Sequence, residues 1–505
     1  MNTYTFLITA LALFVLFPAQ PLSADGLPQA AVAGHKSRLI VLSDMGNEPD
    51  EEQQILHLLM CHNEFDLEGL IAVTSVHLRA TNRDAYRRVI HPERFHHLIN
   101  AYEKIHPNLH RHADGWLPPF DLRLLVVSGQ PEYGMAGTGE GKSTDGSELI
   151  IRQVTKDDPR PVFIVVNAGS NTLAQALIDY RATHTPEELK AFVAKLRVFE
   201  NGAQDDAGAW IAHTFPDIHW IRGKYQSKAY GGPARSRLGP HVWKPFAYST
   251  KGQDNWAHEH IRKGHGALGE VYPMRLFFRM SFESPTFIEG GGTIPWLSLV
   301  ARGLTDPSEQ TWGGWSGRYT ASKVANIPAD SPHVKKHEEV FKPWYTYTDA
   351  KDRWTDPETG EVHEDEYAAI WHWRQAFWND FRARMDWCVK TYDEANHHPV
   401  ATIGDDATEA ILFLTAKIGQ TLTFDAGKST DPDGDSLRFK WWIYPEAGQR
   451  PYGKVLPIDA PHRPKVSLTV PVDAAGRQLH LILEVWDESP IVPLADYRRI
   501  VIDVN

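Results

Sequence analysis

The sequence predicts a protein in two parts: an α/β domain built on a mostly parallel β-sheet flanked by helices, and an all-β sandwich. Along the first half of the chain, short bulky apolar runs alternate with segments whose apolar residues recur at helical spacing. Strands separated by helices pair in parallel through right-handed crossovers. Near residue 400 the pattern changes to short alternating runs divided by turn residues, which is typical of sandwiches.

Composition limits the classes of function. A chain of 505 residues is too long for one ordinary domain and suggests two or three. Its formal net charge of −12 and pI near 6.1 provide no basic surface of the kind that nucleic-acid backbones require. We therefore expect no nucleic-acid partner.

Residues 1–24 have the pattern of a secretory signal peptide. An apolar run from Phe6 to Phe17 is followed by Pro18 and then by the small residues Ser23 and Ala24, and the run is too short to span a bilayer comfortably. The sequence thus predicts export to the periplasm or the extracellular space, with no membrane association once the signal is removed. The oligomeric state cannot be read from the sequence.

The first predicted strand ends in a group of acids. Residues 39–42 form a bulky run suited to a buried parallel strand, and helical spacing begins again near residue 55. Between them lie the acids that we call the acidic cluster: Asp44, Glu48, Asp50 and Glu51. Ligands of open α/β sheets bind outside the carboxyl ends of the strands, so these acids are candidate oxygen ligands. The alternative is that they only cap the following helix.

Further strands and helices follow in alternation. Strands are expected at 68–75, at 121–129 and at the starts of 160–180 and 196–215, with another at 217–223. Helices are expected at 82–105, at 146–154, at the ends of 160–180 and 196–215, and over 364–392. Residues 223–345 are rich in Gly, Pro and Trp, and long loops of this kind usually carry function. We predict an α/β domain over 36–345, a helical extension over 346–397 and a sandwich over 398–505.

Several short motifs resemble known binding sites, but the residues around them do not fit those sites. GHGALG (264–269) follows a polar, helix-like segment rather than a strand, so we do not interpret it as a dinucleotide site. Residues 429–437, STDPDGDSL, space their acids like a calcium loop but lack its Gly and Glu, so we interpret them first as a turn and only second as a metal site. Cys61 and Cys388 are expected to be buried thiols, although a bond between them is not excluded.

Taken together, several blocks resemble one known family. They are SDMGNEPDEEQ, FDLEGLIAVTS, VVNAGSNTLAQAL, NGAQDDAGAW, GLTDPSEQTWGGWSGRY and STDPDGDSLRFKWW, in this order from about Arg38 to the end of the chain. The arrangement resembles the nucleoside hydrolase superfamily. In particular, it resembles the secreted branch of cellulose-binding, nucleoside-hydrolase-like proteins with a C-terminal immunoglobulin-like domain. This resemblance implies a nucleoside-hydrolase-like fold for the α/β domain and an immunoglobulin-like sandwich after it.

The resemblance also implies roles for the acidic cluster. The superfamily opens with D-x-D-x-G-x-D-D, whose second Asp matches Asp44 and whose final pair matches Asp50 and Glu51 after a two-residue insertion. The matching residues imply that Asp44 is a calcium ligand and the general base. They imply that Glu51 is a second ligand and that Asp50 accepts hydrogen bonds from sugar hydroxyls. The family's metal-binding backbone carbonyl falls near Asn171.

Other polar residues complete the predicted substrate site, which would bind a nucleoside or a carbohydrate. They are Glu48, Asn167, Asn201, Gln204, Asp205, Asp206 and Glu289. For the group at 201–206, helix capping and turn formation explain the residues equally well. Such a site would hydrolyse an N-ribosyl or related glycosyl bond through an oxocarbenium-like state, assisted by calcium.

Two departures from the family keep a second function open. The branch is expected to supply a last calcium ligand from an Asp in an E-G-D-T-P-like run, but this chain reads EGGGTIP (289–295), and Glu289 is the acid that could replace it. No His-Asp dipeptide supplies a leaving-group acid. The alternative function is non-catalytic binding of cellulose or another polysaccharide. In that case sugar rings would stack on tryptophans, for which the candidates are Trp296, Trp312, Trp315, Trp441 and Trp442.

Overall fold

A computed structural model describes residues 36–230, 256–273, 275–276, 283–284, 290–321, 329, 331–357 and 360–505. The predicted signal peptide and Glu289 lie outside these ranges. None of the described helices is both long enough and apolar enough to cross a membrane.

An eight-stranded sheet forms the centre of the first domain, in the order β3-β2-β1-β4-β5-β6-β10-β9. Its strands are β1 (Arg38–Ser43), β2 (Asp66–Ala72), β3 (Val126–Ser128), β4 (Val162–Val166), β5 (Leu196–Asn201), β6 (His219–Gly223), β9 (Tyr319–Ala321) and β10 (Tyr347–Asp349). All neighbouring pairs run parallel except β10 and β9. The predicted mostly parallel sheet is therefore confirmed.

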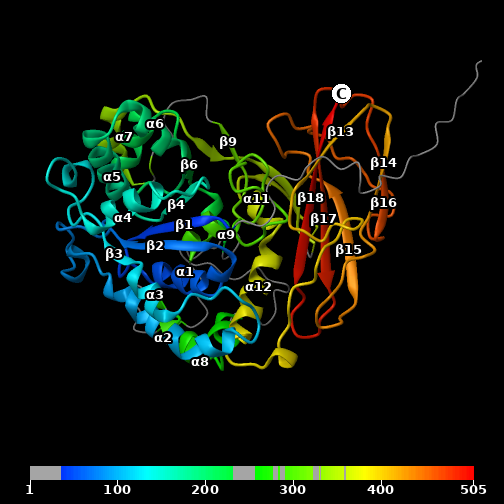
Figure 1. Ribbon diagram of the computed structural model, residues 1–505, viewed down its shortest axis with the longest axis horizontal. Coiled ribbons are helices and arrows are strands. Elements are labelled where there is room, and N and C mark those ends of the chain that lie inside the picture. Colours follow the sequence, from blue (N-terminus) through cyan, green and yellow to red (C-terminus); the bar gives the residue numbers. More distant parts are fainter. Residues whose placement is uncertain are drawn as a thin grey trace, which may run out of the picture.

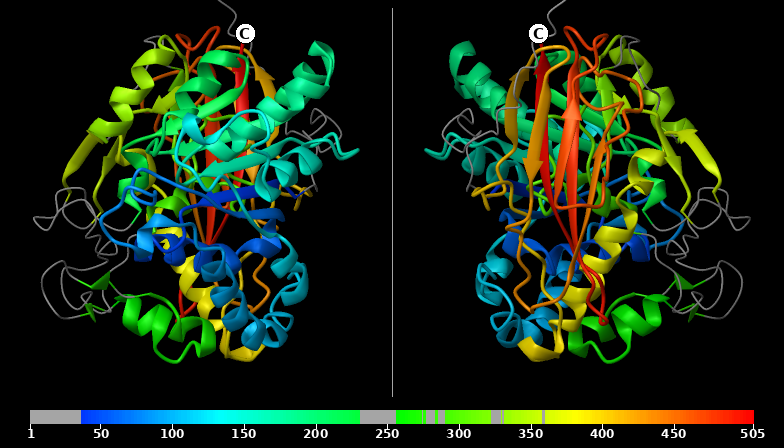
Figure 2. Two further views of the ribbon diagram at one scale, coloured as in Figure 1. Left: turned by 90° about the vertical axis from the view of Figure 1, so that its left-hand side faces the viewer. Right: turned by 90° about the vertical axis from the view of Figure 1, so that its right-hand side faces the viewer.

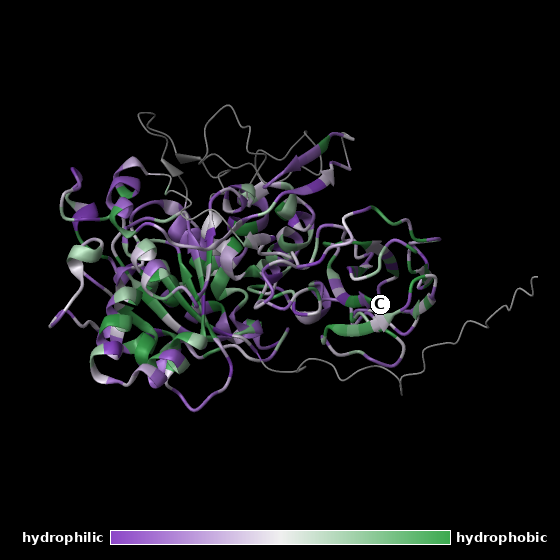
Figure 3. Cartoon of the chain, turned by 90° about the horizontal axis from the view of Figure 1, so that it is seen from above, coloured by the Kyte–Doolittle hydropathy of each residue, from purple (hydrophilic) through white to green (hydrophobic). Residues whose placement is uncertain are grey.

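Helices cover both faces of this sheet (Figure 1). One face carries α4 (Asp145–Val154), α5 (Asn171–Thr183), α6 (Pro186–Ala194) and α7 (Ala207–Thr214), and the other carries α1 (Pro49–Leu59), α2 (Glu93–Leu109), α3 (Pro119–Leu124) and α8 (Gly266–Glu270). Successive residues of a strand point to opposite faces, so Ile40 and Leu42 pack with α4 and α5, and Leu39 and Val41 pack with α1 and α2. Figure 3 shows the hydrophobic strands at the centre of this domain.

Shorter elements connect and extend the sheet. They are η2 (His62–Glu64), η3 (Tyr86–Arg88), η4 (Met135–Gly137), η5 (Gln226–Ala229), η7 (His258–Arg262), β7 (Arg275–Leu276), β8 (Glu283–Ser284), η8 (Gly291–Thr293), α9 (Ile294–Leu297), α10 (Pro332–Glu338), η9 (Glu339–Phe341), β11 (Asp352–Thr355), β12 (Val362–Asp365), α11 (Ala368–Trp371), α12 (Arg374–Asp386) and η10 (Tyr392–Glu394).

Three predicted elements differ from the structure. The strand expected over 121–129 is reduced to β3, because Pro118 and Pro119 begin the short helix α3 instead, and proline is well suited to the first turn of a helix. The helix expected over 82–105 begins only after Pro92, as α2. The extension predicted over 346–397 begins with β10, β11 and β12 before its helices.

The C-terminal region is all-β, as predicted. One sheet has the order β13-β18-β17-β15 and a second pairs β14 with β16. The strands are β13 (Leu412–Ala416), β14 (Thr421–Asp425), β15 (Leu437–Ile443), β16 (Lys465–Thr469), β17 (Gln478–Asp487) and β18 (Ala495–Val504). Both sheets contribute to one core, with Leu422 and Phe424 from the second sheet and Leu481 and Ile500 from the first. The right-hand view of Figure 2 looks onto these strands.

Helix α12 lies between the two domains (Figure 1). Its Phe377 belongs to the same buried core as Trp315, which precedes β9, and Tyr497 of β18. The rings of Trp315 and Tyr497 meet edge to face at 6.2 Å. A continuous aromatic core therefore joins the α/β domain to the sandwich.

Candidate functional site

The acidic cluster lies where the strand order reverses. Strand β1 pairs with β2 on one side and β4 on the other, and Leu42 is opposite Val166. Consequently Asp44, just after β1, and Asn167, just after β4, flank the crevice between these strands. In open α/β sheets this topological switch point is where ligands bind.

The carboxylate of Asp44 is completely buried. Its side chain is 0% exposed, and neither carboxylate oxygen has a partner at normal hydrogen-bond geometry among the described residues. Burial raises the pKa of Asp44 to about 7, the nearby hydroxyl of Ser75 opposes this shift, and the negative charges of Asp50 and Glu48 add to it. A carboxyl with a pKa near neutrality, beside further acids, can exchange protons with a substrate or accept a cation.

The other acids of the cluster occupy the start of α1. Glu48 and Glu51 form a capping box, in which the backbone N–H of Glu48 donates to Oε2 of Glu51 at 2.8 Å. The capping alternative is thus realised for these two residues. Burial raises the pKa of Glu51 well above its usual value, and the charges of Asp50 and Asp44 add to the shift. The four acids therefore influence one another electrostatically as one group.

Two side-chain amides face the crevice from other loops. The Nδ2 group of Asn167 donates to the carbonyl of Gly292 at 2.9 Å and to Oε1 of Gln54. The Nε2 group of Gln204 donates to the Asn167 carbonyl at 2.8 Å. Within the described parts of the chain, Oδ1 of Asn167 and Oε1 of Gln204 accept no hydrogen bond. Both amides are thus fixed through nitrogen and leave their oxygens available.

Two more asparagines have buried side-chain oxygens of the same kind. Asn171 begins α5 and is fully buried, and its Nδ2 group donates to the Glu132 carbonyl at 2.7 Å. Asn47 lies between Gly46 and Glu48 and is 5% exposed. The Oδ1 atoms of both lack a donor in the region that the structure describes. Asn47 and Gln54 were not among the predicted site residues, although Asn47 lies inside the acidic stretch.

The predicted aspartates after β5 hold the backbone of neighbouring loops and helices. Asp205 is fully buried and accepts the backbone N–H of Ala207 at 3.0 Å and of Asn171 at 3.1 Å. Asp206 accepts the backbone N–H of Met135 at 2.9 Å. Burial raises the pKa of Asp205 to about 8, with a smaller contribution from Asp206. These contacts favour the capping alternative for Asp205. Asp206 makes no side-chain hydrogen bond to α7 and instead holds the loop at Met135, while Asn201 ends β5 half-buried.

A recess opens beside the acidic cluster, with a volume of about 320 Å³. We call it the outer recess. It is lined by Gly46, Asn47, Glu48, Pro49, Glu52, Tyr86, Arg94 and Pro273. This volume lies within the range of small-molecule sites, and Glu48 belongs to both the recess and the cluster. The crevice therefore has an adjoining space that is large enough for part of a ligand.

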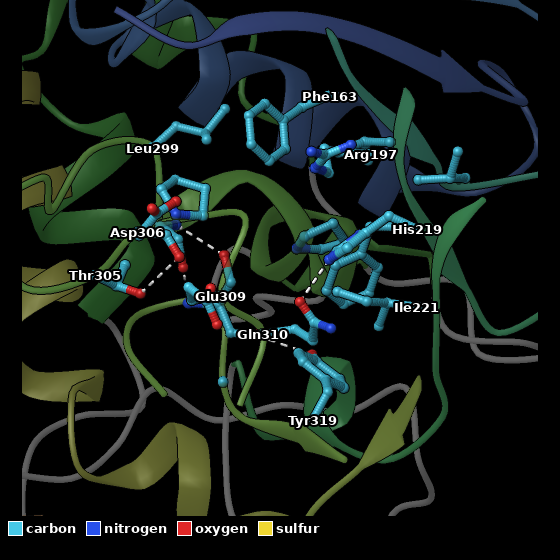
Figure 4. A pocket seen from close by; sticks show the side chains of 18 of the residues that line it. Phe163, Arg197, His219, Ile221, Leu299, Thr305, Asp306, Glu309, Gln310 and Tyr319 are labelled. Atoms are coloured by element: carbon cyan, nitrogen blue, oxygen red, sulfur yellow. Dashed lines mark hydrogen bonds between the residues drawn. The ribbon is translucent and has the colours of Figure 1, made fainter. Parts of the chain in front are cut away.

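A second pocket lies at the opposite edge of the sheet (Figure 4). It is lined by the first residues of β5 and β6, including Arg197 and His219, and by loop residues such as Asp306 and Glu309. His219 is already hydrogen-bonded to the Ser308 carbonyl at 3.2 Å. With a volume of about 40 Å³, this cavity has room for only a few water molecules.

A buried group of His57, Cys61 and Asp380 has atoms within 4.8 Å of one another. Oδ1 of Asp380 already accepts Nε of Arg384 at 2.7 Å and lies 2.8 Å from Nε2 of His398. Because a guanidinium already neutralises this carboxylate, a cation would gain little there. Cys61 and Cys388 are both buried free thiols, as expected, and form no disulfide.

The tryptophans proposed as sugar platforms are mostly core residues. Trp296 is 0% exposed, Trp315 2%, Trp441 1% and Trp312 6%, while Trp442 is half-buried and its ring stacks on His372. The prediction that rings stack on sugars is therefore wrong for the four buried tryptophans, and it stays a prediction for Trp442. Long-range packing between the domains buries them, as when Trp312 meets Arg499 of β18.

The loop over 429–437 is a turn held by its own acid. Oδ1 of Asp431 accepts the backbone N–H groups of Asp433 at 2.9 Å and Asp435 at 3.0 Å. Asp433 in turn accepts the backbone N–H of His397 at 2.8 Å. These hydrogen bonds agree with the turn interpretation, and the loop links the sandwich to the segment that follows α12.

Comparisons with known proteins give a consistent result. Residues 38–319 match the family model described as cellulose-binding Sde182, nucleoside hydrolase-like domain, and residues 421–504 match the model described as cellulose-binding protein Sde0182, C-terminal domain. No curated protein matches the chain. A solved structure from Saccharophagus degradans is similar to it, with 35% identity and a TM-score of 0.76 over 93% of this chain and 100% of that one. It is described as a nucleoside hydrolase-related hypothetical protein associated with carbohydrate metabolism.

Proposed function

The chain belongs to the Sde182 family of cellulose-binding, nucleoside-hydrolase-like proteins, and on this premise we propose that it hydrolyses a glycosyl bond with the help of calcium. The proposed site is the acidic cluster with the amides that surround it. The proposed substrate is a carbohydrate or a nucleoside, and the proposed place of action is outside the cytoplasm.

One observation carries this proposal: among the described residues, several buried acceptor oxygens at the carboxyl ends of β1, β4 and β5 have no hydrogen-bond donor. They are both carboxylate oxygens of Asp44 and the side-chain oxygens of Asn47, Asn167, Asn171 and Gln204. A buried polar atom without a partner costs about 1–3 kcal/mol, and natural proteins have few of them. So many in one crevice are best explained by a cation or by ligand hydroxyls that supply the missing partners.

The chemistry of these oxygens fits calcium. Calcium takes six to eight oxygen ligands from carboxylates, carbonyls and water, and the described residues of the crevice offer carboxylate and amide oxygens. Asp44 and Glu51 would hold the ion, together with a carbonyl near Asn171. When bound, calcium would orient sugar hydroxyls and lower the pKa of a nearby water.

The residues of the chain supply the remaining roles. Asp44, a buried carboxylate just after β1, would accept the proton of the attacking water. Asp50 and Glu48 would accept hydrogen bonds from sugar hydroxyls and stabilise positive charge on the ring as the bond breaks. Asn167 and Gln204 would hold further hydroxyls through their oxygens, since both amides are fixed through nitrogen.

A second candidate function is carbohydrate binding without catalysis. The description of the family as cellulose-binding favours it, and so does the run EGGGTIP, in which the last expected calcium ligand is missing. In this case the same crevice would hold a sugar but lack turnover. The buried tryptophans take no part in either function.

An activity screen separates the two candidates. The full chain is incubated with aryl glycosides, cello-oligosaccharides and ribonucleosides, with calcium or with a chelator, and released sugar is measured. Turnover that needs calcium and disappears in Asp44→Asn supports the hydrolase. Calcium-independent sugar binding without turnover, unchanged in Asp44→Asn, would contradict it and support the binding protein.

A further inference from the structure

An aromatic pair stands at the mouth of the crevice. The rings of Tyr86, in η3, and His91 stack with centroids 3.9 Å apart and an angle of 18° between their planes. His91 is held by Glu93, whose carboxylate lies 2.6 Å from its Nδ1, and by the Tyr86 carbonyl, 2.7 Å from its Nε2. With His91 fixed behind it, Tyr86 has a set orientation while its side chain stays 47% exposed.

The aromatic pair contacts the loop that carries the acidic cluster. Gly46 has a φ of +87°, and a Cβ there would lie 2.9 Å from the His91 ring and 3.0 Å from the Tyr86 hydroxyl. A side chain at this position would therefore be both strained and obstructed. This close approach sets Tyr86 directly beside the segment between Asp44 and Glu48.

A charged pair forms another wall of the outer recess. Arg94 donates from Nε to Oε1 of Glu52 at 2.9 Å and from Nη2 to Oε2 at 2.7 Å. These bonds use two of the five N–H groups of the guanidinium and one acceptor position on each carboxylate oxygen. The pair can therefore both donate to and accept from hydroxyl groups, and the Arg94 side chain is 34% exposed.

We propose that the outer recess binds a second, neutral sugar ring, linked to the sugar held by the acidic cluster, so that the chain prefers oligosaccharides to nucleosides. The inference rests on the proposed function, because it places the first ring in the crevice. Tyr86 stacks on the apolar face of the second ring, and Glu52 and Arg94 bind its hydroxyls.

The lining of the recess favours a sugar over a nucleobase. A nucleobase gains most from apolar or aromatic contact on its faces, but Tyr86 is the single aromatic residue that lines the described recess. The charged lining residues are Glu48, Glu52 and Arg94, which sum to a net negative charge and so disfavour a phosphorylated ligand. Hydroxyl groups match a wall that both donates and accepts hydrogen bonds.

Calorimetric titrations of the full chain in calcium buffer test this inference. The probes are cellobiose, methyl β-glucoside as a single ring, and inosine. The variants are Tyr86→Ala, Tyr86→Phe, which keeps a stacking ring, and Tyr345→Ala. Tyr345 is a matched control because it is 54% exposed and precedes β10, at the opposite edge of the sheet from the crevice.

We expect the wild-type chain to bind cellobiose more tightly than inosine. Tyr86→Ala should weaken cellobiose binding by about 5- to 10-fold and leave methyl β-glucoside unchanged, while Tyr86→Phe and Tyr345→Ala stay within about twofold of wild type for cellobiose. The inference is overturned if cellobiose does not bind, if Tyr86→Ala binds it normally, or if inosine is the tighter ligand.

A fourth variant distinguishes failure of the inference from failure of the proposed function. If Asp44→Asn leaves methyl β-glucoside binding intact while Tyr86→Ala still weakens cellobiose binding, the proposed site for the first ring is wrong but the recess binds sugar as inferred. If Asp44→Asn abolishes binding of both sugars while Tyr86→Ala changes neither, the acidic cluster keeps its proposed role and the recess inference fails.

Discussion

Two groups of buried carboxylates in this molecule differ in whether they are paired with cations. Around α12, Asp380 lies against Arg384 and His398, and Arg384 also reaches Glu64 at 3.0 Å. We call these residues the ion-pair cluster. At the carboxyl edge of the sheet, Asp44 is equally buried but has no hydrogen-bond partner among the described residues.

The pKa values of the two aspartates reflect this difference. Burial alone favours the neutral acid in both, but Arg384 and His398 hold the pKa of Asp380 well below its usual value. Burial dominates for Asp44 and raises its pKa to about 7. The ion-pair cluster is therefore internally complete and stabilises the junction of the domains, whereas the carboxylate of Asp44 has no cation bound to it among the described residues and is suited to a ligand.

The largest effect is expected from breaking the ion-pair cluster. Arg384→Met removes the guanidinium from the buried Asp380 and Glu64 and leaves Asp380 with His398 alone, so it should lower the free energy of unfolding by about 3–5 kcal/mol. Urea denaturation measures this change. The double variant Asp380→Asn with Arg384→Met should recover part of the loss. A cost below about 1 kcal/mol for the single variant would show that the two clusters do not differ as described.

Substitution of Asp44 should change the free energy of unfolding in the opposite direction. In calcium-free buffer at pH 7.5, Asp44→Asn should raise the free energy of unfolding by about 1–3 kcal/mol, because it removes a carboxylate whose ionised form is disfavoured by burial. The same urea titration, run with a chelator, measures the change. Asp380→Asn serves as the comparison and should destabilise. A loss of stability in Asp44→Asn would mean that Asp44 already has a favourable partner.

The pH dependence of stability should differ in the same way. The pKa of Asp44 rises from 3.8 to about 7 on folding, so the folded chain holds a proton that the unfolded chain releases. Without calcium, its contribution to the free energy of unfolding should therefore fall as pH rises from about 4 to 7, with a slope of at most about 1.4 kcal/mol per pH unit.

Thermal unfolding between pH 4 and 8 measures this slope. The free energy of unfolding should depend less on pH in Asp44→Asn than in wild type, because the variant lacks the carboxyl that releases its proton on unfolding. Asp380 acts in the reverse direction, because its lowered pKa means that its contribution is lost only as pH falls below about 4. An identical pH profile for wild type and Asp44→Asn would contradict the raised pKa.

No loss of stability is expected at Glu51. Gln preserves the capping box with Glu48 and removes a buried carboxylate whose pKa burial raises, so in calcium-free buffer Glu51→Gln should leave the free energy of unfolding unchanged or raise it. The lost charge should nevertheless weaken calcium binding by at least about tenfold. Chemical denaturation and calcium titration of one preparation separate the two roles. If the calcium affinity is unchanged, Glu51 is not a calcium ligand and its only role is to cap α1.

Much of the fold could be predicted from local sequence. The run before Asp44 ends in acids and a turn, so its place at a strand end followed from the chain itself, and the parallel sheet puts Asn167 at the same edge. The pairing of Gln54 with Asn167 could not be predicted, because it depends on α1 and two separate loops meeting in space.

Other features needed long-range packing that no short segment specifies. Trp312 and Trp315 have the composition of a binding surface, yet contacts with Arg499 and Tyr497 bury them. Similarly, the sequence alone allows Asp205 either to bind a ligand or to cap a helix. The structure favours capping, because the backbone N–H groups of Asn171 and Ala207 donate to its carboxylate. Tyr86 lies in the segment that the sequence predicted to be helical (82–105), and nothing in that pattern indicated a binding role.

Calorimetric titration of calcium into chelator-treated full-length protein at pH 7.5 tests the central claim most directly. Asp44→Asn and Asp431→Asn are measured in parallel, since Asp431 lies in the other acidic loop of the chain. We predict one calcium site in the wild-type chain, lost in Asp44→Asn and unchanged in Asp431→Asn. Absence of binding in the wild type, or a site that survives Asp44→Asn and disappears in Asp431→Asn, would contradict the account.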